Sequence, residues 1–161
     1  MAARAAWLAG VVARTPVGRL GDGLWLIANN FSTGGAQSSA RRLLNAMKDR
    51  GLRVRAATIQ EQPDYATPGR CALLDAGIPV LAVPPADGRA VEEAAEPLLD
   101  AIADDPPQAV FFWNVITSWK VLLADALPLF DPADTRAGIP LSIPTGQNLL
   151  GATSVKFGTA S

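Results

Sequence analysis

Residues 24–59 read LWLIANNFSTGGAQSSARRLLNAMKDRGLRVRAATI, and this one segment contains the pattern of a strand, a loop, a helix and a second strand. Its first residues, 24–29, form a continuous apolar run that follows Gly23 and precedes a polar, glycine-rich stretch. A run of this kind is typical of a strand that is buried on both faces. Residues 29–35, NNFSTGG, then supply the loop.

The helix after this loop has one apolar face. Apolar side chains recur at helical spacing from residue 36, whereas the charged residues of the segment lie largely elsewhere. Gly51 supplies a stop signal, and residues 53–60 are the predicted second strand. Together these elements make one βαβ unit with parallel strands. The apolar face comprises Ala36, Ala40, Leu43, Leu44 and Met47.

The same alternation continues along the chain. We expect helices at residues 68–76, 91–103 and 117–127, and strands at residues 79–83 and 109–113. Gly77 should end the first of these helices, and Pro97 should bend the second or shift its start. Alternating strands and helices imply a parallel sheet with helices on both faces. The sequence therefore predicts an α/β fold, a Rossmann-like three-layer domain with a mostly parallel sheet.

Both ends of the chain depart from this alternation. Residues 1–20 imitate a signal peptide only loosely, because their apolar stretch is short and the usual cleavage-site spacing is missing. We expect an N-terminal arm or short helix there, and the Rossmann-like domain at residues 21–128. Residues 129–161 are predicted to be an irregular C-terminal tail with short strands near residues 141–143 and 154–157. This tail is either a loosely packed extension, or the chain has been cut short or shifted out of its ancestral reading.

The composition argues against several classes of protein. Hydrophobic residues make up 49% of the chain, and its 14 basic and 15 acidic residues nearly cancel. No basic stripe stands out, so we expect no nucleic-acid binding. No apolar run is long enough to span a membrane, so we expect no transmembrane segment. The single cysteine, Cys71, suits a reducing compartment, and we predict a cytoplasmic protein.

The chain contains no histidine, and this removes several kinds of catalytic site. Ser-His-Asp hydrolysis, Cys-His catalysis and His-ligated zinc are excluded within the chain. Cys71 lacks the usual activating base, so we expect a buried, inert thiol rather than a nucleophile. No carboxylates have the spacing of metal ligands, and Asp104 and Asp105 are interpreted as the polar end of a helix. The sequence therefore indicates no metal site and identifies no catalytic residue.

Two segments are expected at the carboxyl edge of the sheet, where open parallel sheets bind ligands. The first is the loop at residues 29–37, NNFSTGGAQ, where Gly34 and Gly35 would let the backbone approach an anion at the start of the helix. This loop is neither the dinucleotide fingerprint nor a P-loop. The alternative is a tight turn in which Ser32 or Thr33 caps the helix.

The second segment is Trp113–Asn114, at the end of the fourth expected strand. Asn114 could hydrogen-bond a sugar or a phosphate-linked group, and it is our candidate substrate-binding residue; the alternative is a helix cap or a turn. Trp113 could stack on a sugar face. Because Phe111 and Phe112 adjoin Trp113, we favour core packing for its ring.

Residues 24–59, with Gly-Gly-Ala-Gln at 34–37, resemble the amino-terminal domain of GT-B glycosyltransferases of the family-4 type. In that domain a strand is followed by a Gly-Gly-Ala-Gln/Glu loop, a helix that ends in a glycine, and a second strand. Residues 109–128, AVFFWNVITSWKVLLADALP, are similar to a later strand–helix unit of some members. The resemblance covers roughly residues 24–128.

The resemblance implies retaining transfer of a sugar from a nucleotide sugar to a glycan or small-molecule acceptor. The nucleotide-sugar donor is then a co-substrate, and no other cofactor is implied. The family's first domain mostly binds the acceptor, while its glycine loop contacts the donor diphosphate through backbone N–H groups. Carried over to this chain, those contacts fall to Gly34 and Gly35, with Gln37 following.

The chain also departs from the family pattern. Members carry a second Rossmann-like domain with a basic pair and paired glutamates, and nothing here matches it. Many members place a histidine near the acceptor; here Asn114 stands near where such a polar residue would lie. We therefore expect a truncated GT-B half, or one that works with a separate donor domain, and no activity without that domain.

Two other classes of function remain open on the sequence. One is a non-catalytic sugar- or protein-binding α/β module. The other is a different α/β enzyme that uses a nucleotide or flavin. The sequence disfavours a dinucleotide site, because Gln60 ends the expected second strand and Glu61 comes only just beyond it.

Overall fold

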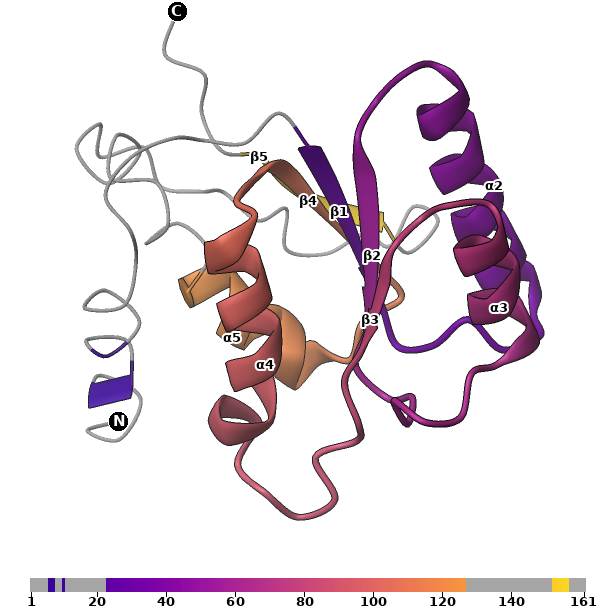
Figure 1. Cartoon of the computed structure of the whole chain (residues 1–161). Coiled ribbons are helices and arrows are strands. Elements are labelled where there is room, and N and C mark those ends of the chain that lie inside the picture. Colours follow the sequence, from indigo (N-terminus) through magenta and orange to yellow (C-terminus); the bar gives the residue numbers. More distant parts are fainter. Residues whose placement is uncertain (1–5, 8–9, 11–22, 127–151, 157–161) are drawn as a thin grey trace, which may run out of the picture.

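The computed structural model describes residues 6–7, 10, 23–126 and 152–156, and in these ranges strands and helices alternate along the chain (Figure 1). The strands are β1 (Gly23–Ala28), β2 (Val54–Thr58), β3 (Val80–Ala82), β4 (Pro107–Trp113) and β5 (Ala152–Lys156). The helices are α2 (Gly35–Asp49), α3 (Pro68–Asp75), α4 (Val91–Asp104) and α5 (Thr117–Ala126).

All five strands belong to one sheet, in the order β3-β2-β1-β4-β5. The first four strands are parallel to their neighbours, and β5 pairs with β4 in the antiparallel sense. Strands β2 and β3 extend the sheet to one side of β1, and β4 extends it to the other. The direction of winding therefore reverses between β1 and β4, which makes this the topological switch point of the sheet.

The helices cover both faces of the sheet. Helices α2 and α3 lie on one face and α4 and α5 on the other, as Figure 1 shows. The side chains of β1 alternate between the two layers because successive residues of a strand point to opposite faces. Trp25 and Ile27 join the core under α4 and α5, and Leu26 and Ala28 join the core under α2 and α3. The predicted Rossmann-like, three-layer α/β fold with a mostly parallel sheet is confirmed.

Helix α2 begins one residue earlier than its apolar pattern predicts. Its N-cap is Gly34, and no side chain bonds the cap, so the alternative in which Ser32 or Thr33 caps the helix is not observed. The Ser32 hydroxyl instead donates to Oδ1 of Asn30, within the loop itself. The predicted apolar face is observed in the later turns, where Ala40 and Leu44 are buried, but Ala36 is exposed.

The later elements also follow the sequence prediction closely. Pro97 lies inside α4, which still begins at Val91, so this proline does not shift the start of the helix. Strand β4 begins at Pro107, two residues before the predicted start. The strand expected near residues 154–157 is observed as β5, whereas the one expected near 141–143 lies outside the described residues.

Part of the predicted N-terminal arm or helix is described as well. Trp7 is helical and packs against the core beneath α4 and α5. Its indole Nε1 donates a hydrogen bond of 2.8 Å to Oε1 of Glu96 in α4. At least this residue of the N-terminal segment is therefore attached to the domain.

The expectation for Cys71 is wrong, because the structure exposes this residue on α3. Helix α3 turns Gly69, Arg70 and Leu73 inward. Residues at this spacing share one helical face, and Cys71 falls on the opposite face. The apolar neighbours in the sequence suggested burial, but a short helix on one side of a sheet buries only part of its surface.

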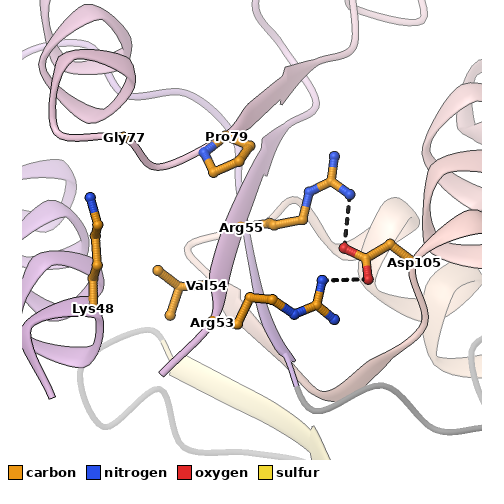
Figure 2. Close-up of a pocket in the computed structure, with 7 residues that line it drawn as sticks. All are labelled: Lys48, Arg53, Val54, Arg55, Gly77, Pro79 and Asp105. Carbon is orange, nitrogen blue, oxygen red and sulfur yellow. Dashed lines mark hydrogen bonds and ion pairs between the residues drawn. The ribbon is translucent and has the colours of Figure 1, made fainter. Parts of the chain in front are cut away.

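An ion-pair cluster ties three elements together at the amino edge of the sheet (Figure 2). Asp105, the C-cap residue of α4, accepts hydrogen bonds from Nη1 of Arg53 at 2.7 Å and from Nη1 of Arg55 at 2.9 Å. The Asp105 carbonyl accepts from Nε1 of Trp25, and the Arg55 guanidinium lies 4.7 Å above the Trp25 ring. The predicted role of Asp104 and Asp105 as the polar end of a helix is confirmed.

The cluster also controls the ionisation of Asp105. Partial burial raises its pKa, but the hydrogen bonds from Arg55 and Arg53, together with the positive charges of both guanidinium groups, outweigh burial and lower the pKa below its usual value. The unfolded chain therefore binds this proton more readily than the folded chain. The stabilisation is fully present above the unfolded pKa and is lost as the pH falls through the lower, folded pKa.

We predict that Asp105→Asn lowers the free energy of unfolding by on the order of 1 kcal/mol at neutral pH, because partly exposed ion pairs contribute little each. The difference from the wild type should be constant above about pH 4 and should shrink at lower pH, where the wild-type carboxylate is itself protonated. Urea unfolding followed across this pH range measures both effects. Asp104→Asn, at a neighbouring exposed carboxyl, is the control, and a difference that persists unchanged into acid would contradict the assignment.

Candidate functional site

The loops after β1 and β4 meet at the carboxyl edge of the sheet, at the switch point. Two hydrogen bonds join them across this point. The backbone N–H of Ile116 donates to Oδ1 of Asn29 at 3.1 Å, and Nε1 of Trp113 donates to the carbonyl oxygen of Ala36 at 2.8 Å. The topology therefore brings together the two segments that the sequence singled out, although 77 residues separate Trp113 from Ala36.

The amino end of α2 presents backbone N–H groups at this edge. The first intrahelical bond runs from the N–H of Ser38 to the carbonyl of Gly34, so the preceding N–H groups of the helix have no intrahelical acceptor. Among the described residues no side chain caps this end, and its first turn contains no acidic residue. Gly34, Gly35 and Ala36 are exposed. These features, with the positive end of the helix dipole, are suited to an anion.

The two glycines of the loop have different surroundings. A Cβ atom on Gly34 would overlap the side-chain amide of Gln37, which folds back over the N-cap. A Cβ atom on Gly35 would meet no heavy atom within 4 Å. Gly34 therefore permits a close contact within the loop, and Gly35 leaves open space in front of the helix. Gln37 lies beside the predicted anion contact and is partly buried.

Asn114 stands at the end of β4 with a left-handed backbone, at φ 52°. Asparagine tolerates this conformation better than most residues, and the turn reverses the chain toward α5. The Asn114 side chain is exposed. It lines a small pocket together with Asn29, Gln37 and Trp113. The structure thus brings Asn114 and Gln37 to one place, while turn formation accounts for the backbone of Asn114.

The pocket at the switch point is small. Its volume is about 10 Å³, which is roughly the room that one water molecule needs. The Trp113 ring is partly buried and packs against the core under α2 and α3. Its packing therefore agrees with the expected core position rather than with stacking on a sugar. A ligand as large as a nucleotide would have to lie outside this pocket, over the exposed Gly34 and Gly35.

A buried carboxylate that sequence reasoning missed supports the glycine loop from below. Glu61, which is 4% exposed, accepts hydrogen bonds from the N–H of Phe31 at 2.7 Å and from the hydroxyl of Thr67 at 2.8 Å. Its other oxygen faces Arg70, which is 3% exposed, at 3.4 Å. Arg70 also donates to the carbonyl oxygens of Gln62 and Pro63. Glu61 thereby fixes the loop after β1 to the loop after β2 and to α3.

Glu61 is therefore occupied by the protein itself. From the sequence, Glu61 counted only against a dinucleotide site, because it lies just beyond the second strand. Its actual partners lie up to 30 positions away along the chain. A polar residue just after a strand was the one available signal. The spacing between Glu61 and Phe31 carries no recognisable motif, because the contact depends on two adjacent parallel strands.

A second contact holds the same loop in place. Gly69, near the start of α3, packs so closely on Phe31 that a Cβ atom there would overlap the Phe31 carbonyl oxygen. Backbone hydrogen bonds from Ile59 to Ala28 and from Gln60 to Asn29 run alongside. The first half of the glycine loop is thus rigidly attached to its neighbour, which is a precondition for a preorganised site.

Other kinds of site are not found in the ranges that the structure describes. Within those ranges no three His, Cys, Asp or Glu residues gather where they could hold a metal ion. No helix there is long and apolar enough to cross a membrane.

Comparison with protein-family models, with curated proteins and with solved structures gave no match for this chain. The similarity to glycosyltransferases therefore has only the residues quoted above as its support. It enters below as a proposal.

We predict that Gly69→Ala destabilises the fold by about 1–3 kcal/mol, because the added methyl group must displace backbone rather than a flexible side chain. Gly35→Ala is the matched control. Its methyl group projects into open space and should leave the free energy of unfolding unchanged within about 0.5 kcal/mol or raise it slightly. Urea denaturation of both variants tests the close contact, and equal midpoints would contradict it.

We predict that Glu61→Ala destabilises the fold by about 3–5 kcal/mol, because it leaves the Arg70 charge buried without its carboxylate. The control is Asp64→Ala, which removes an exposed carboxylate from the same loop and should change stability by less than about 0.5 kcal/mol. Chemical denaturation measures both. A small effect of Glu61→Ala would mean that water reaches Arg70 and that the network is not a structural centre.

Proposed function

We propose that this chain is an acceptor-side domain of a GT-B glycosyltransferase, whose glycine loop contacts the diphosphate of a nucleotide sugar. One observation carries the proposal: the uncapped amino end of α2, with Gly34 and Gly35 exposed, lies at the switch point of a parallel sheet. This is the position at which open α/β sheets bind ligands. The sequence resemblance at residues 24–59 supplies the identity of that ligand.

In this proposal the backbone N–H groups at the start of α2 stabilise the leaving diphosphate. Sugar transfer breaks the bond between the sugar and the diphosphate, so negative charge accumulates on the leaving group. Fixed N–H donors are effective there because they need no reorganisation during the reaction. Gln37, one turn into the helix, supplies an amide near the same group, and Asn114 supplies a hydrogen-bonding side chain for the sugar or the acceptor.

The proposed site by itself should bind weakly. The described residues that line the adjacent pocket are all uncharged, so this pocket offers a diphosphate dipoles and hydrogen-bond donors but no positive charge. Nucleotide-sugar sites also need basic residues, and in GT-B enzymes the second domain supplies them. We therefore propose that sugar transfer by this domain requires a donor domain, whether in the same gene product or in a partner.

A second candidate is a non-catalytic sugar- or protein-binding module. The observation that favours it is the narrow pocket, which the bonds from Trp113 to Ala36 and from Ile116 to Asn29 hold closed. In such a module Gly34 and Gly35 serve the turn alone, and a ligand contacts the exposed Asn114 without any reaction.

We predict that uridine diphosphate shifts the amide resonances of residues 34–38, and that Gly35→Asp weakens this binding at least about tenfold by placing a carboxylate at the anion site. Gly35→Asn has nearly the same size without the charge and should retain binding. An aspartate in the first turn suits the helix dipole, so Gly35→Asp should stay folded.

The two candidates give different outcomes in this titration. Binding at residues 34–38 that Gly35→Asp abolishes and Gly35→Asn keeps supports the glycosyltransferase proposal. If uridine diphosphate and its glucose conjugate produce no shifts there, even with a GT-B donor domain added, the proposal is wrong. Glycan-induced shifts at Asn114 that neither variant changes would then identify the non-catalytic module.

A further inference from the structure

A larger pocket lies at the opposite edge of the sheet. Its volume is about 380 Å³, within the usual range for small-ligand sites, and it surrounds the start of β2. Figure 2 shows Lys48 on one side of the strand and Arg53, Arg55 and Asp105 on the other. Because the glycine loop lies at the carboxyl edge, this pocket is separate from the site proposed above.

Positive charge is in excess in this pocket. Among the described residues that line it, three side chains are cationic and only Asp105 is anionic. Asp105 is shared between Arg53 and Arg55, so one carboxylate faces two guanidinium groups. Lys48 donates to the carbonyl oxygen of Ala76, which is a neutral acceptor. The part of the chain that the structure describes offers Lys48 no carboxylate partner.

Arg55 retains unused hydrogen-bond donors. A guanidinium has five N–H groups, and that of Arg55 gives Nη1 to Asp105 and rests its face on Trp25. Within the described residues no other acceptor bonds Arg55. Its side chain is 32% exposed. One edge of the guanidinium is therefore satisfied by the protein, and the rest can receive a ligand.

The same contacts hold Arg55 in position before any ligand arrives. The Asp105 carboxylate fixes one edge, the Trp25 ring fixes the plane, and the Trp25 indole in turn bonds the Asp105 carbonyl. A fixed side chain loses little conformational entropy on binding, which favours affinity. Arginine held in this way suits the planar, paired oxygens of a carboxylate or phosphate group.

We propose that the pocket at the amino edge binds a small anionic molecule through a phosphate or carboxylate group, with Arg55 as the direct contact. Lys48 contributes to the attraction from the other side of β2. Asp105 orients Arg55, and its own charge opposes the ligand. A cation would face three like charges, and an apolar ligand would leave the guanidinium donors without acceptors, so neither class fits.

The test is a titration of the full chain with inorganic pyrophosphate and, separately, with succinate, followed by amide resonances. Both probes carry the required oxygens, and their relative affinities distinguish a phosphate from a carboxylate ligand. We expect shifts at residues 53–55 and 77–79. Arg55→Gln should weaken binding at least about tenfold, because Arg55 contacts the anion directly. Lys48→Gln should weaken it about two- to threefold, because Lys48 attracts the anion only by its charge at a distance. The control Arg42→Gln removes an exposed charge of α2 outside the pocket and should have no effect.

Asp105→Asn distinguishes an anion-binding role of the arginine cluster from a role in stability alone. This variant weakens the ion-pair cluster but removes the competing negative charge, so we expect it to bind pyrophosphate or succinate a few-fold more tightly. The proposal is overturned if neither anion shifts residues 53–55, or if Arg55→Gln and Arg42→Gln bind equally well. Shifts confined to residues 34–38 also overturn it, and would belong to the glycine loop instead. The same titrations in Gly35→Asp should be unchanged at the amino edge, so failure of either proposal leaves the other intact.

Discussion

Strand β1 is buried on both of its faces, and the layers and strand pairing of the fold follow from this burial. Trp25 and Ile27 point into one helical layer, and Leu26 and Ala28 point into the other. A strand of this kind needs a helix on each side and a hydrogen-bonded neighbour at each edge, because its backbone polar groups are buried too. Strand β2 pairs with β1 at one edge, and β4 pairs with it at the other. Their opposed winding creates the switch point.

The two edges of this sheet differ in chemistry. At the carboxyl edge the pocket is lined by uncharged residues, and no side chain caps the N–H donors at the start of α2. At the amino edge the charges are carried by side chains, and Asp105 partly neutralises them. In the two proposals, an anion at the first edge would meet fixed backbone dipoles and an anion at the second would meet charged side chains.

The rigidity of the glycine loop comes from residues outside it. Glu61 receives the Phe31 N–H, and Gly69 contacts the Phe31 carbonyl, so both backbone groups of one loop residue are in contact with the β2–α3 region. Arg70 compensates the buried charge and is itself bonded to the Gln62 and Pro63 carbonyls. Beyond Phe31 the loop is held from β4, because the Ala36 carbonyl accepts a hydrogen bond from Nε1 of Trp113. Gly34 and Gly35 are therefore exposed in a loop that is held in place at Phe31.

The amino-acid sequence alone predicted the order and type of the elements, because the apolar runs of β1 and β4 and the helical period of α2 and α4 are local patterns. It also marked Gly34, Gly35 and Asn114 as residues that follow strands. It was wrong about the burial of Cys71, because burial there depends on which face of α3 packs against its neighbours. The packing of the folded chain was needed to show that the loop and Asn114 meet, that Glu61 lies beneath Phe31, and that Arg53 and Arg55 share Asp105. Those contacts join residues far apart in the chain, where local periodicity carries no information.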